Sequence, residues 1–276
     1  MNICSMSKPI TNRPGFVSKA LRAPKMPAFT LYGSRGSTNT DRVRLTLAEG
    51  GFTDYEFVLL NLQKGEQKVS PSRELPNLNN INNPTQSPSN LTRHPFGKIP
   101  AITFPSGFTL YESRAICTYL ARKYSFPLLP PSPATGIEHD LEATALFDQA
   151  QSVETHYFAE PAGKISFELF AKKFMGLPAD KAVVAQALKA VEGFFDVAER
   201  MLQEREYMAG REFTVVDVFY IPLVQRLFAC GYGDVIQSRG AVNAWWERCV
   251  NRPAIRKMLA GDGEVAVAAA AAAKRV

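Results

Sequence analysis

The chain has 276 residues, of which 46% are hydrophobic and 21% charged, a balance typical of soluble globular proteins with room for two domains. Its net charge of +6 is modest, and no Lys/Arg stretch with interleaved aromatic residues indicates a nucleic-acid groove. No apolar run reaches the roughly 18 residues of a membrane helix, so we expect no membrane span. The cysteines form no CxxC pair, which fits a reducing compartment. The histidines share no metal-ligand spacing, so we expect no metal site.

The first 25 residues are basic, contain no Asp or Glu and include three prolines. We expect a disordered basic extension over residues 1–26. Two alternatives stay open: a mitochondrial targeting segment, or residues that precede a natural start at Met26. Without targeting, the cytoplasm is the expected location.

The first half alternates strand and helix patterns. Apolar runs predict strands over residues 29–32, 55–59, 99–104 and 108–110. Helical periodicity begins at Thr40 and stops at Gly50-Gly51, and a second helix covers "YESRAICTYLARKY". The "PSG" between the last two strands predicts a hairpin turn. This order, β-α-β and then β-β-α, predicts a small α/β layer domain.

The second half is predicted to be helical. A proline-rich linker at residues 125–136 precedes helices near residues 138–174 (broken at 161–163), 179–206, 214–230 and 241–259. Within "FTVVDVFYIP", Thr214 and Asp217 form a capping box that starts a helix. Residues 70–87 are rich in Asn, Pro and Ser, which predicts a disordered insertion. Residues 261–276 are predicted to form a flexible alanine-rich tail.

Hydroxyl residues cluster in "LYGSRGSTNTDRVRLTL", between the first strand and the first helix. A helix N-terminus offers free N–H groups and partial positive charge, so Ser37 could stabilise an anion there. The alternative is that Ser37 or Thr38 only caps the helix. Thr38 and Thr40 are alternative donors to the anion.

A second set of residues favours a ligand with a free amino-acid end. In "HPFGKIPAI", Ile99-Pro100 suggests a cis peptide bond that turns a main-chain amide outward. In "LYESRAI", Ser113 begins a helix that can hold a carboxylate, and Glu112 can hold an amine. Together these groups suit a small peptide.

These motifs, with "KGEQK", "YMAGREFTVVDVFYIP" and "NRPAIRKM", resemble the glutathione transferases, most closely the phi class of plants and fungi, over about residues 27–260. The resemblance implies the fold class α/β plus all-α. A thioredoxin-like glutathione-binding domain would cover residues 27–124, and an all-helical domain would cover residues 137–260. It also implies a homodimer, and glutathione as co-substrate with no further cofactor.

The resemblance assigns roles to matching positions. Ser37 matches the catalytic serine that stabilises the glutathione thiolate. The expected glutathione-binding residues are Lys68 at the glycine carboxylate, Lys98, Ile99 at the cysteinyl part, and Glu112 and Ser113 at the γ-glutamyl end. Phe96 matches an aromatic residue that enters the partner subunit in related classes. Lys98 replaces the Gln common in phi members, and Gln67 replaces a common His. The insertion at 70–87 matches none of the family motifs. We expect it to be inert, with a lid over the glutathione site as the alternative.

The implied reaction joins the glutathione thiolate to small hydrophobic electrophiles, as in detoxification. Phe147, Tyr157 and Phe158 are candidates for an electrophile pocket between the two domains, with core packing as the alternative. Two other functions stay open: glutathione-dependent reduction of organic hydroperoxides, and a non-catalytic binding module. A cysteine-based mechanism at the Ser37 position is disfavoured because residues 33–40 contain no Cys.

Overall fold

The computed structural model describes residues 26–60, 90–130 and 138–261. Lys68, Gln67, the predicted insertion, the first 25 residues and residues 262–276 lie outside the described residues. Among the described helices, none is both long and apolar enough to cross a membrane.

A four-stranded sheet in the order β2-β1-β3-β4 organises the N-terminal part of the chain. Strands β1 (Thr30–Gly33) and β2 (Glu56–Leu59) are parallel. Strand β3 (Ala101–Thr103) runs antiparallel to both β1 and β4 (Thr109–Tyr111). The predicted "PSG" turn joins β3 to β4, and its Gly107 has φ +86°.

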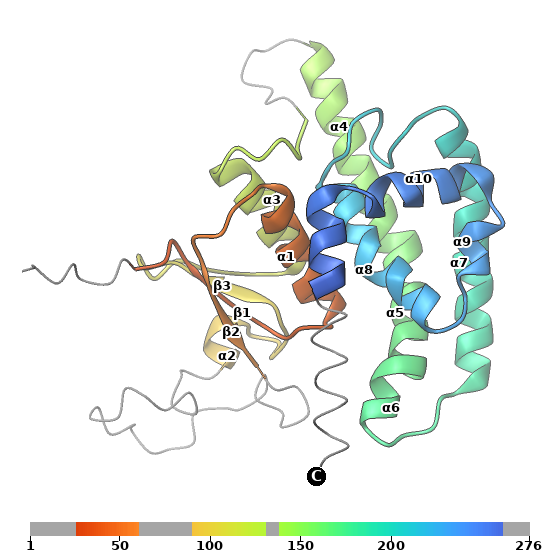
Figure 1. Ribbon diagram of the computed structural model, residues 1–276, viewed down its shortest axis with the longest axis horizontal. Coiled ribbons are helices and arrows are strands. Elements are labelled where there is room, and N and C mark those ends of the chain that lie inside the picture. Colours follow the sequence, from red (N-terminus) through yellow and green to blue (C-terminus); the bar gives the residue numbers. More distant parts are fainter. Residues whose placement is uncertain (1–25, 61–89, 131–137, 262–276) are drawn as a thin grey trace, which may run out of the picture.

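Two helices pack on the face of the sheet that meets the helical half of the molecule (Figure 1). These are α1 (Thr38–Glu49) and α3 (Ser113–Lys123), and both contact helix α8 of the helical half. Helix α1 ends at Gly50, and Gly51 then takes φ +63°, which confirms the predicted stop. The short α2 (Asn90–Arg93), which the sequence pattern did not predict, packs on β3 and β4.

The helical half begins with one long helical run that differs from the prediction. It passes through α4 (Glu138–Val153), η3 (Glu154–Ala159), α5 (Glu160–Ser166), η4 (Phe167–Ala171) and α6 (Lys172–Phe174). The break predicted at residues 161–163 is wrong. A π-helical turn, η3, ends just before Pro161, so the proline occupies the first turn of a new α-helical segment, where its missing N–H is tolerated.

The remaining helices follow the predicted order, with one short helix, α9, that the sequence pattern did not predict. They are α7 (Lys181–Gln203), α8 (Val215–Ala229), α9 (Asp234–Gln237) and α10 (Gly240–Val250), with a last helix over residues 253–261. The single helix predicted over residues 241–259 is therefore two helices. Pro253 starts the second of them because proline cannot donate a backbone hydrogen bond and disfavours helical backbone in the residue before it.

Helix α8 is the central helix of the molecule, buried along most of its length and packed against α1. The predicted capping box at its start, made by Thr214 and Asp217, is confirmed. The buried Asp217 carboxylate also accepts hydrogen bonds from Met208 N and Trp245 Nε1, both at 2.9 Å. The start of α8 is thus tied to the loop before it and to α10.

The overall architecture confirms the expected fold class: a mixed-sheet α/β domain followed by an all-helical domain. Figure 1 shows the sheet and its helices on one side, and the helical bundle on the other, with α1 and α8 between them.

Candidate functional site

Strand register brings the predicted site residues to one end of the sheet. Tyr32 in β1 pairs with Ala101 in β3, which in turn pairs with Tyr111 in β4. Because β3 is antiparallel to both neighbours, the chain leaving β1, the chain entering β3 and the chain leaving β4 meet at this end. The turn to Ser37, the segment with Ile99, and the Glu112-Ser113 pair therefore lie close together.

The turn from β1 to α1 has a specific geometry that depends on two glycines. A Cβ on Gly33 would lie 2.5 Å from the Thr40 side chain, so only glycine fits there. Gly36 has φ +75°, a conformation that side chains other than hydrogen disfavour. Thr40 is fully buried behind the turn, and its Oγ1 accepts from Ser34 N at 3.3 Å. This placement excludes Thr40 as an alternative donor to the ligand.

Ser37 is the N-cap of α1. Its Oγ accepts from Thr40 N at 3.4 Å, a long hydrogen bond. Within the described part of the chain, the Ser37 hydroxyl donates to no acceptor, and neither the Thr38 nor the Asn39 backbone N–H does. Capping therefore leaves the Ser37 hydroxyl hydrogen and two helix-end N–H groups for an anion.

The segment before β3 presents its main chain. The Ile99–Pro100 bond is cis, as the sequence suggested, and the Ile99 side chain is buried. Asn90 Nδ2 donates to Lys98 O at 2.6 Å, which fixes the segment from α2. Among the described residues, no hydrogen bond occupies the backbone N–H or C=O of Ile99, so an extended ligand can pair with them.

Glu112 is held in an unusual conformation at the start of α3. Its φ is +68°, which costs on the order of 1–3 kcal/mol for a residue other than glycine. It occupies the N-cap position but makes no capping bond with its side chain, which is 62% exposed. The carboxylate is thus available to an amine. His94 Nε2 lies 3.9 Å from it, and burial lowers the His94 pKa, so that ring is neutral at pH 7.

Ser113 is the first residue of α3, and its buried hydroxyl oxygen lies 3.5 Å from Arg42 Nη1. Because arginine can only donate, the Ser113 hydroxyl accepts from it and keeps its own hydrogen for a carboxylate. The N-terminus of α3 adds free N–H groups at the same place. Ser113 and Glu112 together offer the two functions that an amino-acid end requires.

A buried ionic network that the sequence analysis missed lies beneath Ser113. Glu154, with no exposed surface, accepts from Arg42 Nη2 at 3.3 Å and from Arg114 Nε and Nη2 at 2.5 and 2.9 Å. Arg42 also donates to Phe219 O at 2.9 Å and contacts Asn39 Oδ1. Burial lowers the Arg42 pKa to about 10, partly offset by Glu154. Arg42 therefore stays charged at neutral pH.

The predicted electrophile-pocket residues lie elsewhere. Phe158 has no exposed surface and packs against Phe194 and Tyr220, and Phe147 is also in the core. This corrects the prediction for both rings, whose helical spacing reflects core packing. Tyr157 is 66% exposed, but it lines a groove within the helical domain and not a pocket between the domains.

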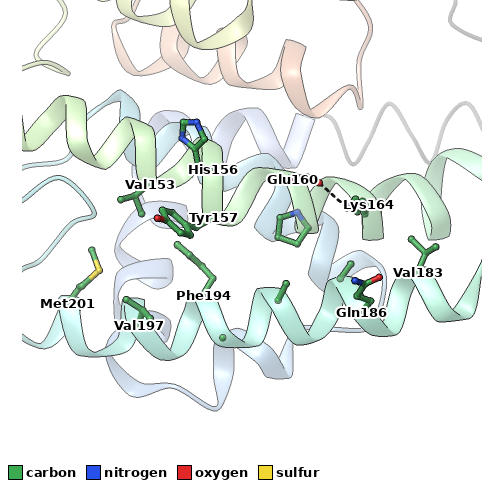
Figure 2. A pocket seen from close by; sticks show the side chains of 14 residues that line it. Val153, His156, Tyr157, Glu160, Lys164, Val183, Gln186, Phe194, Val197 and Met201 are labelled. Carbon is green, nitrogen blue, oxygen red and sulfur yellow. Dashed lines mark ion pairs between the residues drawn. The ribbon is translucent and has the colours of Figure 1, made fainter.

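That groove, of about 680 Å³, runs between the α4–η3–α5 run and α7. Figure 2 shows Tyr157 and Val197 facing it from opposite helices, and the Glu160–Lys164 ion pair at one side. Most of its other lining residues are apolar, among them Val153, Val183 and Met201. Phe96, the predicted partner contact, is 71% exposed on the α/β domain, against His94 and Tyr111.

The sequence held some signs of the missed residues. Arg114 directly follows the Glu112-Ser113 pair. Glu154 lies four residues before Phe158 in a helical pattern, so Glu154 and Phe158 share the buried face of one helix. A carboxylate on such a face indicates a buried ion pair. Its partner Arg42 is 112 residues away in the sequence, and only the fold brings the two together.

Comparisons with known proteins match both halves of the chain. Residues 31–131 match the family model of the glutathione S-transferase N-terminal domain, and residues 152–253 match that of the C-terminal domain. Glutathione S-transferase hmp2 of Hypomyces subiculosus is 35% identical over 78% of this chain and 90% of its own length.

Solved structures agree with these matches. Glutathione transferase F7 of Populus trichocarpa superposes with a TM-score of 0.71 at 28% identity, over 85% of this chain and 99% of its own. Glutathione S-transferase I of maize, solved in complex with an atrazine–glutathione conjugate, gives a TM-score of 0.67 at 30% identity, over 84% of this chain and 97% of its own.

Proposed function

The chain belongs to the glutathione S-transferase family, and we propose that it joins the glutathione thiolate to small hydrophobic electrophiles, with Ser37 stabilising the thiolate. One observation carries the proposal. The Ser37 hydroxyl hydrogen and the first N–H groups of α1 have no acceptor among the described residues, and they lie at the end of the sheet where Ile99, Glu112 and Ser113 meet.

The proposed chemistry is charge stabilisation. A free thiol has a pKa near 8.5 and is mostly protonated at pH 7, whereas the thiolate is the nucleophile. A hydrogen bond from Ser37 to the sulfur anion contributes about 1.5–3 kcal/mol, and the helix N-terminus about 0.3–1 kcal/mol. Since 1.36 kcal/mol equals one pKa unit, the thiol pKa would fall by roughly 1–3 units. Ser37 keeps its own proton in this mechanism.

The remaining groups position glutathione. The main chain of Ile99 pairs with the cysteinyl part, Glu112 holds the α-amino group, and Ser113 with the start of α3 holds the neighbouring carboxylate. Lys98, exposed beside Ile99, and Lys68 are proposed to meet the glycine end. The maize structure with its atrazine–glutathione conjugate supports a conjugating activity on an aromatic electrophile.

The direct test is retention on immobilised glutathione, followed by a conjugation assay with an aromatic halide and a reduction assay with an organic hydroperoxide. We expect retention and conjugation. Retention with peroxide reduction alone would assign the thiolate to the other reaction. Binding without any turnover would indicate a binding module, and failure to bind would refute the proposed function.

We also propose that the protein is a homodimer in which Phe96 of each subunit enters the groove between the α4–η3–α5 run and α7 of the other subunit. The exposed ring of Phe96 and the apolar groove support this pairing because each would cover an apolar surface that faces solvent in the single chain. Phe96 lies on the α/β domain and the groove on the helical domain. A two-fold axis would place Phe96 of each subunit at the groove of the other, so the contact would form twice.

A further inference from the structure

Arg226 bridges the helical domain and the turn that carries Ser37. It lies in the last turn of α8, and its Nη2 donates to Gly36 O at 2.8 Å, across 190 residues of sequence. Its Cζ lies 3.2 Å from the centre of the Phe170 ring in η4. The guanidinium is therefore held between an aromatic ring of the helical domain and the residue just before Ser37.

The turn has weak hydrogen bonds of its own. Ser37 N donates to Ser34 O at 3.3 Å, and Ser34 Oγ donates to Arg35 O at 3.4 Å. The bond from Arg226 is shorter and charge-assisted, which makes it roughly twice as strong as a neutral one. Gly36 also has φ +75°, and its glycine backbone is intrinsically free to adopt other conformations, so a contact that restrains its carbonyl matters more there. Fixing that carbonyl fixes the peptide plane that leads into Ser37.

Arg226 also places a positive charge next to Ser37. Burial lowers the Arg226 pKa, and the Cys230 thiol, which follows α8, and Asp41 on α1 partly offset that effect. The Arg226 Nε is buried and has no hydrogen-bond partner among the described residues, an arrangement that costs stability. A side chain held at such a cost is better explained by the turn it supports than by stability alone.

We propose that Arg226 is a positioning residue for glutathione activation, which holds the Ser37 turn in place from the helical domain and adds positive charge beside the bound sulfur. The inference rests on the proposed function. It extends the site to a domain that contributes none of the predicted glutathione contacts.

The test compares Arg226→Met, which keeps length and contact with Phe170, with Arg226→Lys, which keeps the charge. Arg239→Met is the matched control, because Arg239 binds Asp196 and Val235 O within the helical domain. Three quantities are measured: the pKa of bound glutathione from thiolate absorbance, the conjugation constants, and amide hydrogen exchange at residues 34–38 without glutathione.

For Arg226→Met we expect the bound-thiol pKa to rise by about one unit. The conjugation rate at saturating glutathione should then fall roughly tenfold at a pH below the bound-thiol pKa, where the thiolate is the minor form. Exchange at the turn should speed up, while glutathione affinity changes less than about threefold because Ile99, Glu112 and Ser113 are intact. Arg226→Lys should restore part of the thiol pKa but not the protection of the turn. Arg239→Met should leave both readouts at their wild-type values.

Unchanged thiol pKa and turn exchange in Arg226→Met would overturn the inference while leaving the proposed function intact. Equal shifts in Arg239→Met would also overturn it, since general destabilisation would then explain them. If Arg226→Met does not fold, Arg226→Lys decides: wild-type exchange at the turn would refute the positioning role. A wild-type protein that does not bind glutathione would refute both proposals.

Discussion

At the scale of single residues, Ser113 is the clearest case of a side chain prepared for a ligand. Arg42 donates to its oxygen, so its hydrogen is directed elsewhere. Ser113→Ala should raise the KM for glutathione roughly 10–150-fold, the cost of about 1.5–3 kcal/mol for a charge-assisted hydrogen bond, with a smaller effect on kcat. Steady-state kinetics check this, with Ser106→Ala in the exposed β3–β4 turn as control. Unchanged KM in both Ser113→Ala and Glu112→Gln would contradict the assignment.

Local sequence predicted the residues that begin helices and failed for those that act across the fold. Ser37 and Ser113 could be placed at helix starts because hydroxyl residues are favoured there, and the family resemblance assigned their roles in the site. Arg42 and Arg226 were missed because their partners lie 112 and 190 residues away. Phe158 was assigned to a pocket because helical spacing does not say which of two apolar surfaces a ring faces.

At the scale of elements, the start of α8 depends on one buried carboxylate. Asp217 accepts hydrogen bonds from Thr214 N, Met208 N and Trp245 Nε1. The NH2 group of an asparagine can only donate, so it would face at least one of these N–H groups without forming a hydrogen bond. Asp217→Asn should lower the free energy of unfolding by about 1–3 kcal/mol for each bond lost. Urea titration measures this, and a loss below the error of the method would contradict it.

The same variant tests a pH dependence. Burial raises the pKa of Asp217 above its unfolded value. Between those two values the folded state binds more protons than the unfolded state, so this group makes the protein less stable as pH rises through the folded pKa. Asp217→Asn should lack that decrease. Parallel stability curves against pH for the two proteins would contradict the assignment.

The elements themselves were largely predictable because periodicity and turn residues are local. Gly50-Gly51 and "PSG" ended and joined elements where expected. Helix α2 was missed because four residues carry no periodicity, and the π-helical turn η3 was missed because it keeps a helical pattern through Pro161.

At the scale of the whole molecule, Glu154 ties the two domains together. It is buried between Arg42 of α1 and Arg114 of α3. Glu154→Gln should destabilise the protein by about 3–5 kcal/mol, because the buried Arg42 and the partly exposed Arg114 lose their counter-charge. Glu160→Gln, which breaks an exposed pair on the same helical run, is the matched control and should change stability little. Equal effects of the two variants in urea titration would contradict the role of Glu154.

The proposed dimer gives a second prediction at this scale. Phe96→Ala should shift the monomer–dimer equilibrium toward monomer at micromolar concentration, because the ring would lose the apolar surroundings of its partner's groove. Sedimentation velocity measures the shift. Phe174→Ala, which truncates a ring that is 58% exposed on α6, should leave the dimer intact. A wild-type protein that is monomeric at all concentrations would contradict the proposal.

We propose above that Ser37 and the start of α1 ionise bound glutathione. The most direct measurement is the pKa of the bound thiol, from thiolate absorbance against pH, in the wild type and in Ser37→Ala. We predict a wild-type value roughly 1–3 units below that of the free thiol. Ser37→Ala should move it most of the way back and reduce turnover roughly 10–1000-fold while glutathione still binds. A wild-type value equal to that of free glutathione would contradict the claim, as would a value that changes in Thr38→Ala and not in Ser37→Ala.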